Sequence, residues 1–461
     1  MKLEFDSRLI RKYNGPGPRY TSYPTAPHFR DGFGPADRTR LVEAGNGDPI
    51  PRPLSIYLHL PFCSSPCFYC ACHRVITRDS RKGEAYLKRL KREIGLQARD
   101  VDADRAVRQV HMGGGTPNFY SVEQLGELLE TIARHFRFAA PGAREVAIEL
   151  DPRAVADGDM ARLASVGFNR VSLGLQDLDE DVQRAVNRVQ GSDEPLALIG
   201  EARAEGFGSI NVDLMYGLPR QTPVRFARTV EKVIEAKPDR IALYGYAHMP
   251  DRFRPQVHIR DEELPSPEER LTIFCQAVEQ LTAAGYEYIG MDHFALPEDS
   301  LARARRMGTL IRNFQGYATG DNTDILAMGV TAISQFGGGF SQNTTDLLAY
   351  YNRIDSGRLP VERGMFLSEE DRLRGGIIQS LMCSGRVDIP EVEARYRIRF
   401  RHHFARELEE LEALEADGLV VVEDQAITVT DTGRLLLRPV AMVFDAWLRR
   451  ETEKKRYSRI V

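Results

Sequence analysis

The sequence lacks the features that mark membrane, secreted or nucleic-acid-binding proteins. It has one Trp and 6 Cys in 461 residues, no low-complexity segment and no apolar run long enough to cross a bilayer. Its net charge is only -4, from 62 basic and 66 acidic side chains, so the overall charge does not favour binding of nucleic acid. The first residues, Met1 to Asp6, lack the apolar core of a signal peptide. We therefore expect a cytoplasmic protein with no membrane span and no nucleic-acid partner.

The few cysteines are bunched. Four of the 6 fall between Cys63 and Cys72, directly after the apolar run 54–62. A disulfide framework would spread its cysteines along a small secreted domain, so this pattern argues against one. Cys63, Cys67 and Cys70 have C-x3-C-x2-C spacing, which can hold three corners of an iron-sulfur cluster and leave the fourth iron open. Zinc is the rival ion, but structural zinc sites usually combine two separated pairs, and the sequence has no second pair.

Short apolar runs alternate with longer amphipathic ones from about residue 54 to 335. This alternation predicts an α/β fold of parallel strands joined by crossover helices. Six such units fit a partial (β/α)6 barrel better than the eight of a complete barrel. Strands are expected at 54–60, 107–112, 145–150, 169–175, 208–215 and 239–246, and helices near 83–99, 121–137, 157–166, 179–187, 194–205 and 221–236. Segment 325–338 is interpreted as a close-packed turn near a ligand.

Polar side chains or glycines lie at or just after the carboxyl end of every predicted strand. Parallel barrels place active residues at the carboxyl ends of their strands, so we expect these groups to share one site. They are Tyr57 and His59, the glycine run 113–115 with Thr116, Glu149 and Asp151, Gln176 and Asp177, Asp213, and Tyr244, Tyr246 and His248. Taken alone, Asp151 before Pro152 is better interpreted as a turn cap.

Two regions flank the predicted barrel. Residues 11–25, rich in Gly, Pro and Tyr, should form an extended arm without helix, either on the surface or over a pocket. After about residue 365, charged helices at 368–382, 388–396 and 399–417 and two short alternating runs suggest a mostly helical, winged-helix-like C-terminal domain. Because its basic groups are followed at once by many acids, packing is favoured over DNA binding. The expected domains are an arm at 1–50, a catalytic domain at 51–364 and a helical accessory domain at 365–461.

Two motifs carry a family resemblance. The cysteine spacing, with Tyr69 before Cys70, resembles the radical S-adenosylmethionine signature, and Gly113–Pro117 is similar to that family's cofactor-binding glycine motif. Glycines there would let the backbone approach a ligand closely. The chain resembles the oxygen-independent coproporphyrinogen III oxidase family more closely still, through motifs from about residue 10 to the C-terminus. They are Tyr20–Thr25, Pro61–Cys63, Cys70–Cys72, Glu149–Arg153, Gly174–Asp177, Asn211–Pro219, Tyr246–His248, Gly290–Ala295 and Asn313–Tyr317.

This resemblance implies oxidative decarboxylation of two propionate groups of coproporphyrinogen III to vinyl groups, giving protoporphyrinogen IX in heme biosynthesis through a 5'-deoxyadenosyl radical. It implies a 4Fe-4S cluster on Cys63, Cys67 and Cys70, with S-adenosylmethionine bound at the open iron. It also implies an electron donor such as flavodoxin or a reductase, an electron acceptor of unknown identity, and a monomer.

The resemblance assigns further residues by position. The S-adenosylmethionine on the cluster should contact Tyr57, Gly114, Glu149 and Ile333. A second S-adenosylmethionine should lie near Tyr69, Gly115, Thr116, Gln176, Arg188, Asp213 and Ala247. Without the resemblance, Ile333 and Ala247 would be interpreted as packing residues.

A competing function comes from related heme chaperones, which carry the cluster motif and bind heme without making it. Those proteins resemble this chain through the barrel, but they have Phe where Cys72 stands and lack the arm at Tyr20–Thr25. Cys72 and Tyr20 therefore favour the oxidase and are its predicted catalytic residues.

Overall fold

The computed structural model describes residues 6–319, 323–450 and 457–459. The chain forms two compact units built from non-contiguous segments. The sheet unit comprises Phe29–Ala284 and Asp321–Phe366, and the helical unit comprises Met1–His28, Gly285–Gly320 and Leu367–Val461. The predicted domain boundaries after residues 50 and 364 stay predictions.

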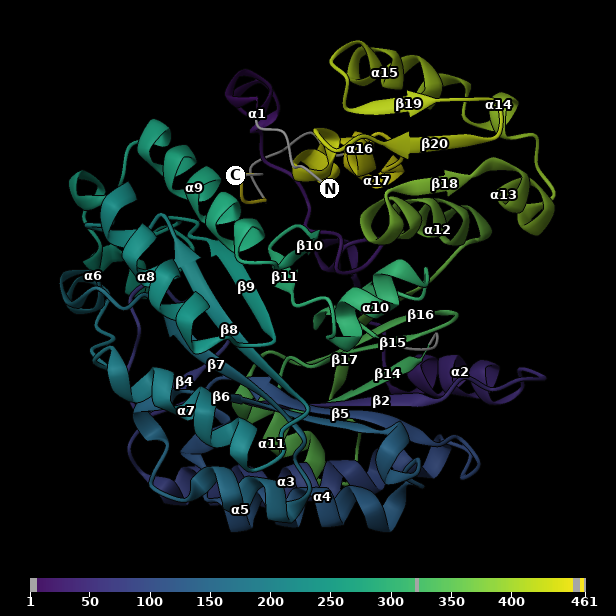
Figure 1. Ribbon diagram of the computed structural model, residues 1–461. Coiled ribbons are helices and arrows are strands. Elements are labelled where there is room, and N and C mark those ends of the chain that lie inside the picture. Colours follow the sequence, from purple (N-terminus) through teal and green to yellow (C-terminus); the bar gives the residue numbers. More distant parts are fainter. Residues whose placement is uncertain (1–5, 320–322, 451–456, 460–461) are drawn as a thin grey trace. The chain divides into compact units, whose positions relative to one another are not determined.

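Six parallel strands form the centre of the sheet unit, as the sequence predicted. In spatial order they are β2 (Leu54–Leu60), β5 (Val107–Gly114), β6 (Glu145–Leu150), β7 (Arg170–Gln176), β8 (Ser209–Tyr216) and β9 (Arg240–Gly245). The connecting helices are α3 (Ser80–Gln97), α4 (Val122–His135), α5 (Asp159–Val166), α6 (Glu180–Ala185), α7 (Asp193–Ala204) and α8 (Pro223–Ala236). Figure 1 shows α3, α4, α5, α7 and α8 along the outer side of these strands. The partial barrel of parallel strands is confirmed.

The helices begin where short polar side chains can satisfy their free N–H groups. The Ser121 hydroxyl accepts from Gln124 N at the start of α4, and Thr222 does the same for α8, which opens on Pro223. Helix α5 ends at Gly167, whose φ of 111° a side chain would strain. These local signals explain why the predicted helices and the observed ones agree closely.

Strand pleating divides each parallel strand into a helix-facing side and an inner side. In β7, Val171, Leu173 and Leu175 are fully buried. The alternate residues Ser172, Gly174 and Gln176 are half-buried and line a cavity. The period of two thus places small and polar groups on the inner side while the apolar groups pack under the helices.

The prediction of a turn over 325–338 is wrong. Strand β14 (Asp324–Met328) is fully buried and pairs in parallel with β2. Antiparallel strands β15 (Ile333–Phe336), β16 (Gly339–Asn343), β17 (Val361–Phe366) and β1 (Arg30–Asp31) extend the sheet beyond it. The turn itself is short and uses Gly329, with a φ of 105°. Thr331, Ser334 and Gln335 interrupt the apolar pattern of this segment, so the pattern did not reveal the hairpin of β15 and β16.

The remaining elements of the sheet unit pack around this sheet. They are α2 (Pro35–Asn46), β3 (Phe62–Cys63), β4 (Val75–Ile76), α9 (Pro267–Ala283) and α11 (Leu347–Asp355). Helix α9 begins after Ser266, whose hydroxyl accepts from Glu269 N.

The helical unit contains the C-terminal helices that the sequence predicted. Its elements are α1 (Ser7–Tyr13), β10 (Glu287–Gly290), β11 (His293–Ala295), α10 (Ser300–Arg306), β12 (Ile311–Asn313), β13 (Gly316–Ala318), α12 (Glu369–Ser384), β18 (Arg386–Asp388), α13 (Ile389–Tyr396), α14 (Phe400–His403), α15 (Ala405–Ala416), β19 (Val420–Val422), β20 (Ala426–Val429), α16 (Leu437–Met442) and α17 (Ala446–Arg450). Strands β18, β20 and β19 form a small antiparallel sheet. The prediction of no helix in 11–25 is wrong for 11–13, because helix α1, which Asp6 caps at its N-terminus, continues to Tyr13.

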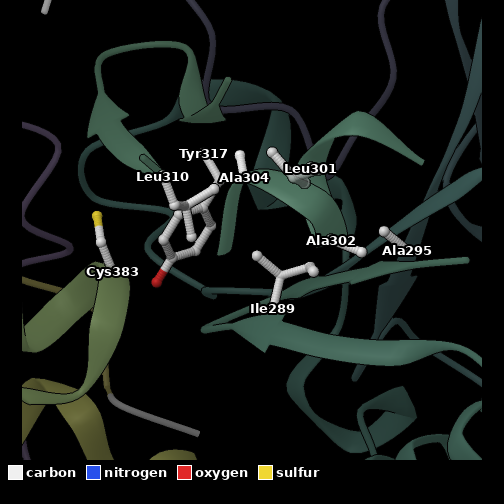
Figure 2. Packing of buried hydrophobic residues seen from close by; sticks show 8 residues of the cluster. All are labelled: Ile289, Ala295, Leu301, Ala302, Ala304, Leu310, Tyr317 and Cys383. Atoms are coloured by element: carbon white, nitrogen blue, oxygen red, sulfur yellow. The ribbon is translucent and has the colours of Figure 1, made fainter. Parts of the chain in front are cut away.

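A buried cluster holds the segment 285–320 against α12 (Figure 2). Ile289, Leu301, Leu310 and Tyr317 pack there with Cys383. The Tyr317 hydroxyl donates to Met382 O at 2.7 Å. No helix among the described residues is long and apolar enough to cross a membrane.

Candidate active site

The carboxyl ends of the parallel strands open on a cavity of about 220 Å³. Predicted site residues gather there from the loop after β2, from β5 and the turn after it, from β6, β7 and β8, and from the segment after α6. Those that line the cavity are Cys63, Cys67, Tyr69, Cys70, Cys72, Gly114, Gly115, Thr116, Glu149, Gln176, Arg188 and Asp213. The structure therefore brings most of the predicted site together at one edge of the sheet.

Hydrogen bonds to neighbouring elements hold the cysteine loop. Asn187 Nδ2 donates to Pro66 O at 2.7 Å, and Gln256 Nε2 donates to Tyr69 O at 3.1 Å. Arg74 Nη1 donates to the carbonyls of Cys70 and Cys72, both at 3.0 Å. Sequence reasoning missed Arg74, although a cation four residues after the last ligand of a cluster motif is a usable signal.

The thiols differ in how readily they lose a proton. Burial raises the pKa of Cys63 to about 11, and Thr116 Oγ1 lies 3.2 Å from its Sγ. A hydrogen bond from Cys72, together with the positive charge of Arg74, lowers the pKa of Cys70 to about 6. The same hydrogen bond and burial raise the pKa of Cys72 well above its usual range. Of these two neighbours, Cys70 is the better thiolate donor.

The glycine run is required by the protein's own packing. A Cβ at Gly113 would lie 2.6 Å from Glu149 Oε1, and one at Gly115 would lie 2.6 Å from the Pro61 carbonyl carbon. At Gly114, where φ is 113°, a Cβ would lie 2.4 Å from the His59 ring. Any side chain at these positions would displace residues that form the floor of the cavity. The glycines are therefore required even in the absence of a ligand.

His111 holds Glu149 in place. His111 Nε2 lies 2.9 Å from Glu149 Oε1, and Gly114 N donates to Glu149 Oε2 at 3.2 Å. Burial acts against the charged carboxylate, but these hydrogen bonds and the charge of His111 lower the pKa of Glu149. The rings of Tyr57 and His111 stack with centroids 5.8 Å apart. Sequence reasoning missed His111, which shares the inward side of β5 with Gly113 two positions later.

The two aspartates predicted at strand ends have different surroundings. Burial and the charge of Glu149 raise the pKa of Asp213 to about 6, and Asn211 Nδ2 donates to it at 2.8 Å. Asp177 does not line the cavity; Thr229 Oγ1 donates to it at 2.8 Å in the buried core. Asp213 thus belongs to the site, whereas Asp177 ties β7 to α8.

Four of the residues that the family resemblance assigns lie off the cavity lining, as do the predicted strand-end residues His59, Tyr246 and His248. The Tyr57 hydroxyl lies 3.3 Å from His59 Nδ1, and Ile333 begins β15. Ala247 O accepts from Gln256 Nε2 at 3.2 Å. Tyr20 belongs to the helical unit, where its hydroxyl donates to Asp445 at 3.0 Å. Their predicted roles stay predictions.

Comparison with known proteins identifies the family. Residues 57–233 match the radical SAM superfamily, and residues 367–436 match the HemN C-terminal domain. The chain is 45% identical over 459 residues to the oxygen-independent coproporphyrinogen III oxidase of Pseudomonas aeruginosa, covering 100% of this chain and 99% of that protein. The chain belongs to the oxygen-independent coproporphyrinogen III oxidase family. The Escherichia coli member is 43% identical over 460 residues, with 100% of this chain and 99% of that protein covered.

A solved structure agrees with this assignment. Coproporphyrinogen III oxidase (HemN) from Escherichia coli, described as a radical SAM enzyme, superimposes with a TM-score of 0.92 at 42% identity, over 97% of this chain and 100% of that one. Family membership confirms the predicted 4Fe-4S cluster and S-adenosylmethionine as cofactors. Among the described residues, no three His, Cys, Asp or Glu side chains are arranged around a single metal ion. The cofactor assignment therefore rests on the family and on three thiols lining one cavity.

Proposed function

We propose that this chain converts coproporphyrinogen III to protoporphyrinogen IX by oxygen-independent decarboxylation of two propionate groups. The observation that carries the proposal is the convergence of Cys63, Cys67 and Cys70 with Glu149 on one cavity, in a chain of this family. When bound, the cluster and S-adenosylmethionine supply the one-electron chemistry that starts the oxidation.

The donor set of the cavity fits both cofactors. Three thiols can hold three irons of a cluster, which leaves one iron for a ligand. Glu149 is held as an anion by His111 and Gly114 N, so it can pair with the cationic amine of S-adenosylmethionine or accept from its ribose. Gln176, at the end of β7, and Asp213, within β8, offer a further donor and acceptor.

The chain's other contributions are orientation and exclusion of water. The inner sides of the strands bring these polar groups to fixed positions on the sheet, and the glycine run lets β5 pack directly on the end of β2. A site with positioned dipoles needs little rearrangement during reaction. The protein thus supplies a rigid polar floor on which cofactors and substrate can be aligned.

Anaerobic incubation with coproporphyrinogen III, S-adenosylmethionine and dithionite tests the proposal. We expect protoporphyrinogen IX to form, with S-adenosylmethionine consumed, and no product from the Cys67→Ser variant. Stoichiometric heme binding without any product would instead support a heme chaperone. Zinc without acid-labile sulfide in anaerobically purified protein would contradict the cluster.

The remaining predicted partners are part of this proposal. We infer an external one-electron donor such as flavodoxin or a reductase, a monomeric enzyme, and a cytoplasmic site of action, where reducing conditions keep the cluster-binding thiols free of disulfides. Size-exclusion chromatography with light scattering tests the monomer. Equilibrium dialysis with labelled S-adenosylmethionine tests the predicted two molecules per chain.

A further inference from the structure

The sulfur of Cys67 is approached by two guanidinium groups. Arg188 Nη1 lies 3.4 Å and Arg153 Nη2 lies 3.5 Å from Cys67 Sγ, distances at which an N–H donates to sulfur. With a cluster bound, this sulfur is an iron-bound thiolate, and both hydrogen bonds become charge-assisted.

Asp151 fixes both guanidiniums beside that sulfur. Arg153 forms a fork with it, Nε to Oδ1 at 3.0 Å and Nη2 to Oδ2 at 2.6 Å, and Arg188 Nη1 reaches Oδ2 at 3.1 Å. Arg153 Nη1 also donates to Asn187 O at 3.4 Å. One carboxylate shared between two guanidiniums leaves an excess of positive charge next to Cys67.

The local sequence explains this arrangement. Asp151 directly follows strand β6 and caps the single turn Pro152–Ala154 by accepting from Arg153 N at 3.1 Å. The turn folds Arg153 back over its own cap, toward the cysteine loop. The side chain of Arg153 keeps 22% of its surface exposed, so it borders the cavity without being enclosed by it.

We infer that Arg153 is a positioning residue for Cys67 and that it raises the reduction potential of the cluster. The inference rests on the proposed function, because it requires a cluster on Cys67. Reduction adds one electron from an external reductant and makes the cluster more negative. Donors to a ligand sulfur and a nearby fixed cation stabilise that more negative state. No proton is involved, since a guanidinium stays charged.

Arg153 can be tested separately from the binding of S-adenosylmethionine. The resemblance implies that Arg188 contacts the second S-adenosylmethionine, so changing Arg188 would mix two effects. Arg153 has no such implied contact. Measuring the reduction potential without S-adenosylmethionine or substrate therefore reports the effect of the hydrogen bond from Arg153 to Cys67 Sγ alone.

The experiment compares the full-length protein with Arg153→Gln, Arg153→Lys and Arg162→Gln. Arg162 is the matched control, an exposed arginine on α5 that pairs with Asp159. Each protein is reconstituted anaerobically, its iron and sulfide are measured, and the cluster is titrated with dithionite while electron paramagnetic resonance follows the reduced form. We expect a midpoint potential more negative than wild type for R153Q, a smaller shift for R153K, which keeps the charge but loses the fork, and no shift for R162Q.

A wild-type midpoint potential in R153Q with full cluster content overturns the inference. Should R153Q assemble no cluster, the titration of R153K decides: a more negative midpoint supports the inference and an unchanged one overturns it. A wild-type protein that assembles no cluster overturns the proposed function itself, which separates the two failures.

Discussion

Replacing His111 by Phe should weaken the binding of S-adenosylmethionine. Phe keeps an aromatic ring against Tyr57 but removes the nitrogen that lies 2.9 Å from Glu149 Oε1. A hydrogen bond to a charged group contributes about 1.5–3 kcal/mol. Because 42% of the Glu149 side chain is exposed, solvent screens this bond and the lower end applies. We expect the affinity to fall by about 10-fold.

Isothermal titration calorimetry on the anaerobically reconstituted protein measures this change. His111→Gln is the rescue variant, because its amide can still donate to Glu149, and its affinity should lie near wild type. His135→Phe, at the exposed end of α4, controls for replacing a histidine elsewhere. Wild-type affinity in H111F, or equal losses in H111Q and H111F, would refute a positioning role for the hydrogen bond.

Three further predictions follow from the same region. Cys70→Ser should abolish cluster assembly while Cys72→Ser retains full iron and sulfide; a full cluster in C70S would contradict the ligand assignment. Gly115→Ala should cost about 1–3 kcal/mol of unfolding free energy, because its Cβ would meet the Pro61 backbone at 2.6 Å, whereas Gly142→Ala, with nothing within 4 Å, should be neutral in urea denaturation. Burial raises the pKa of Asp177 from 3.8 to about 6, so its contribution to stability is present below pH 4 and is lost as pH rises through 6. Relative to Asp177→Asn, wild type should therefore lose about 3 kcal/mol between pH 4 and 7, and parallel stability curves would argue against this.

The parallel strands and their helices could be predicted because each carries its signal locally. Apolar runs of strand length alternate with amphipathic runs that begin at Ser, Thr or Asp caps. The hairpin of β15 and β16 could not be predicted in this way, because several of its buried residues are polar. Ser334 is an example: its Oγ accepts from Ala327 N of the neighbouring strand at 2.9 Å. Buried polar strands have no apolar pattern to detect.

The candidate site also combines features that a local sequence pattern predicts with features that it does not. Cysteine spacing and the glycine run identified the cavity, but His111 and Arg153 act through partners far away in sequence. The alternation of side chains along a strand could have been used to assign Gln176 and Asp177 to different sides of the sheet, because consecutive residues of a strand point to opposite sides. Applying that rule from Ser172 onward assigns Gln176 to the cavity and Asp177 to the helix side.

The anchoring of the cysteine loop has a consequence for how the cluster is installed and repaired. Asn187 and Gln256 hold carbonyls of the loop from distant parts of the chain, and Arg74 holds two more from just after the loop, so the ligand geometry does not depend on iron to organise the chain. Cluster delivery can then follow folding, at little further cost in chain entropy. A cluster destroyed by oxygen could then be rebuilt in the same folded molecule. Loss of activity in air would be reversible for as long as the three thiols stay reduced.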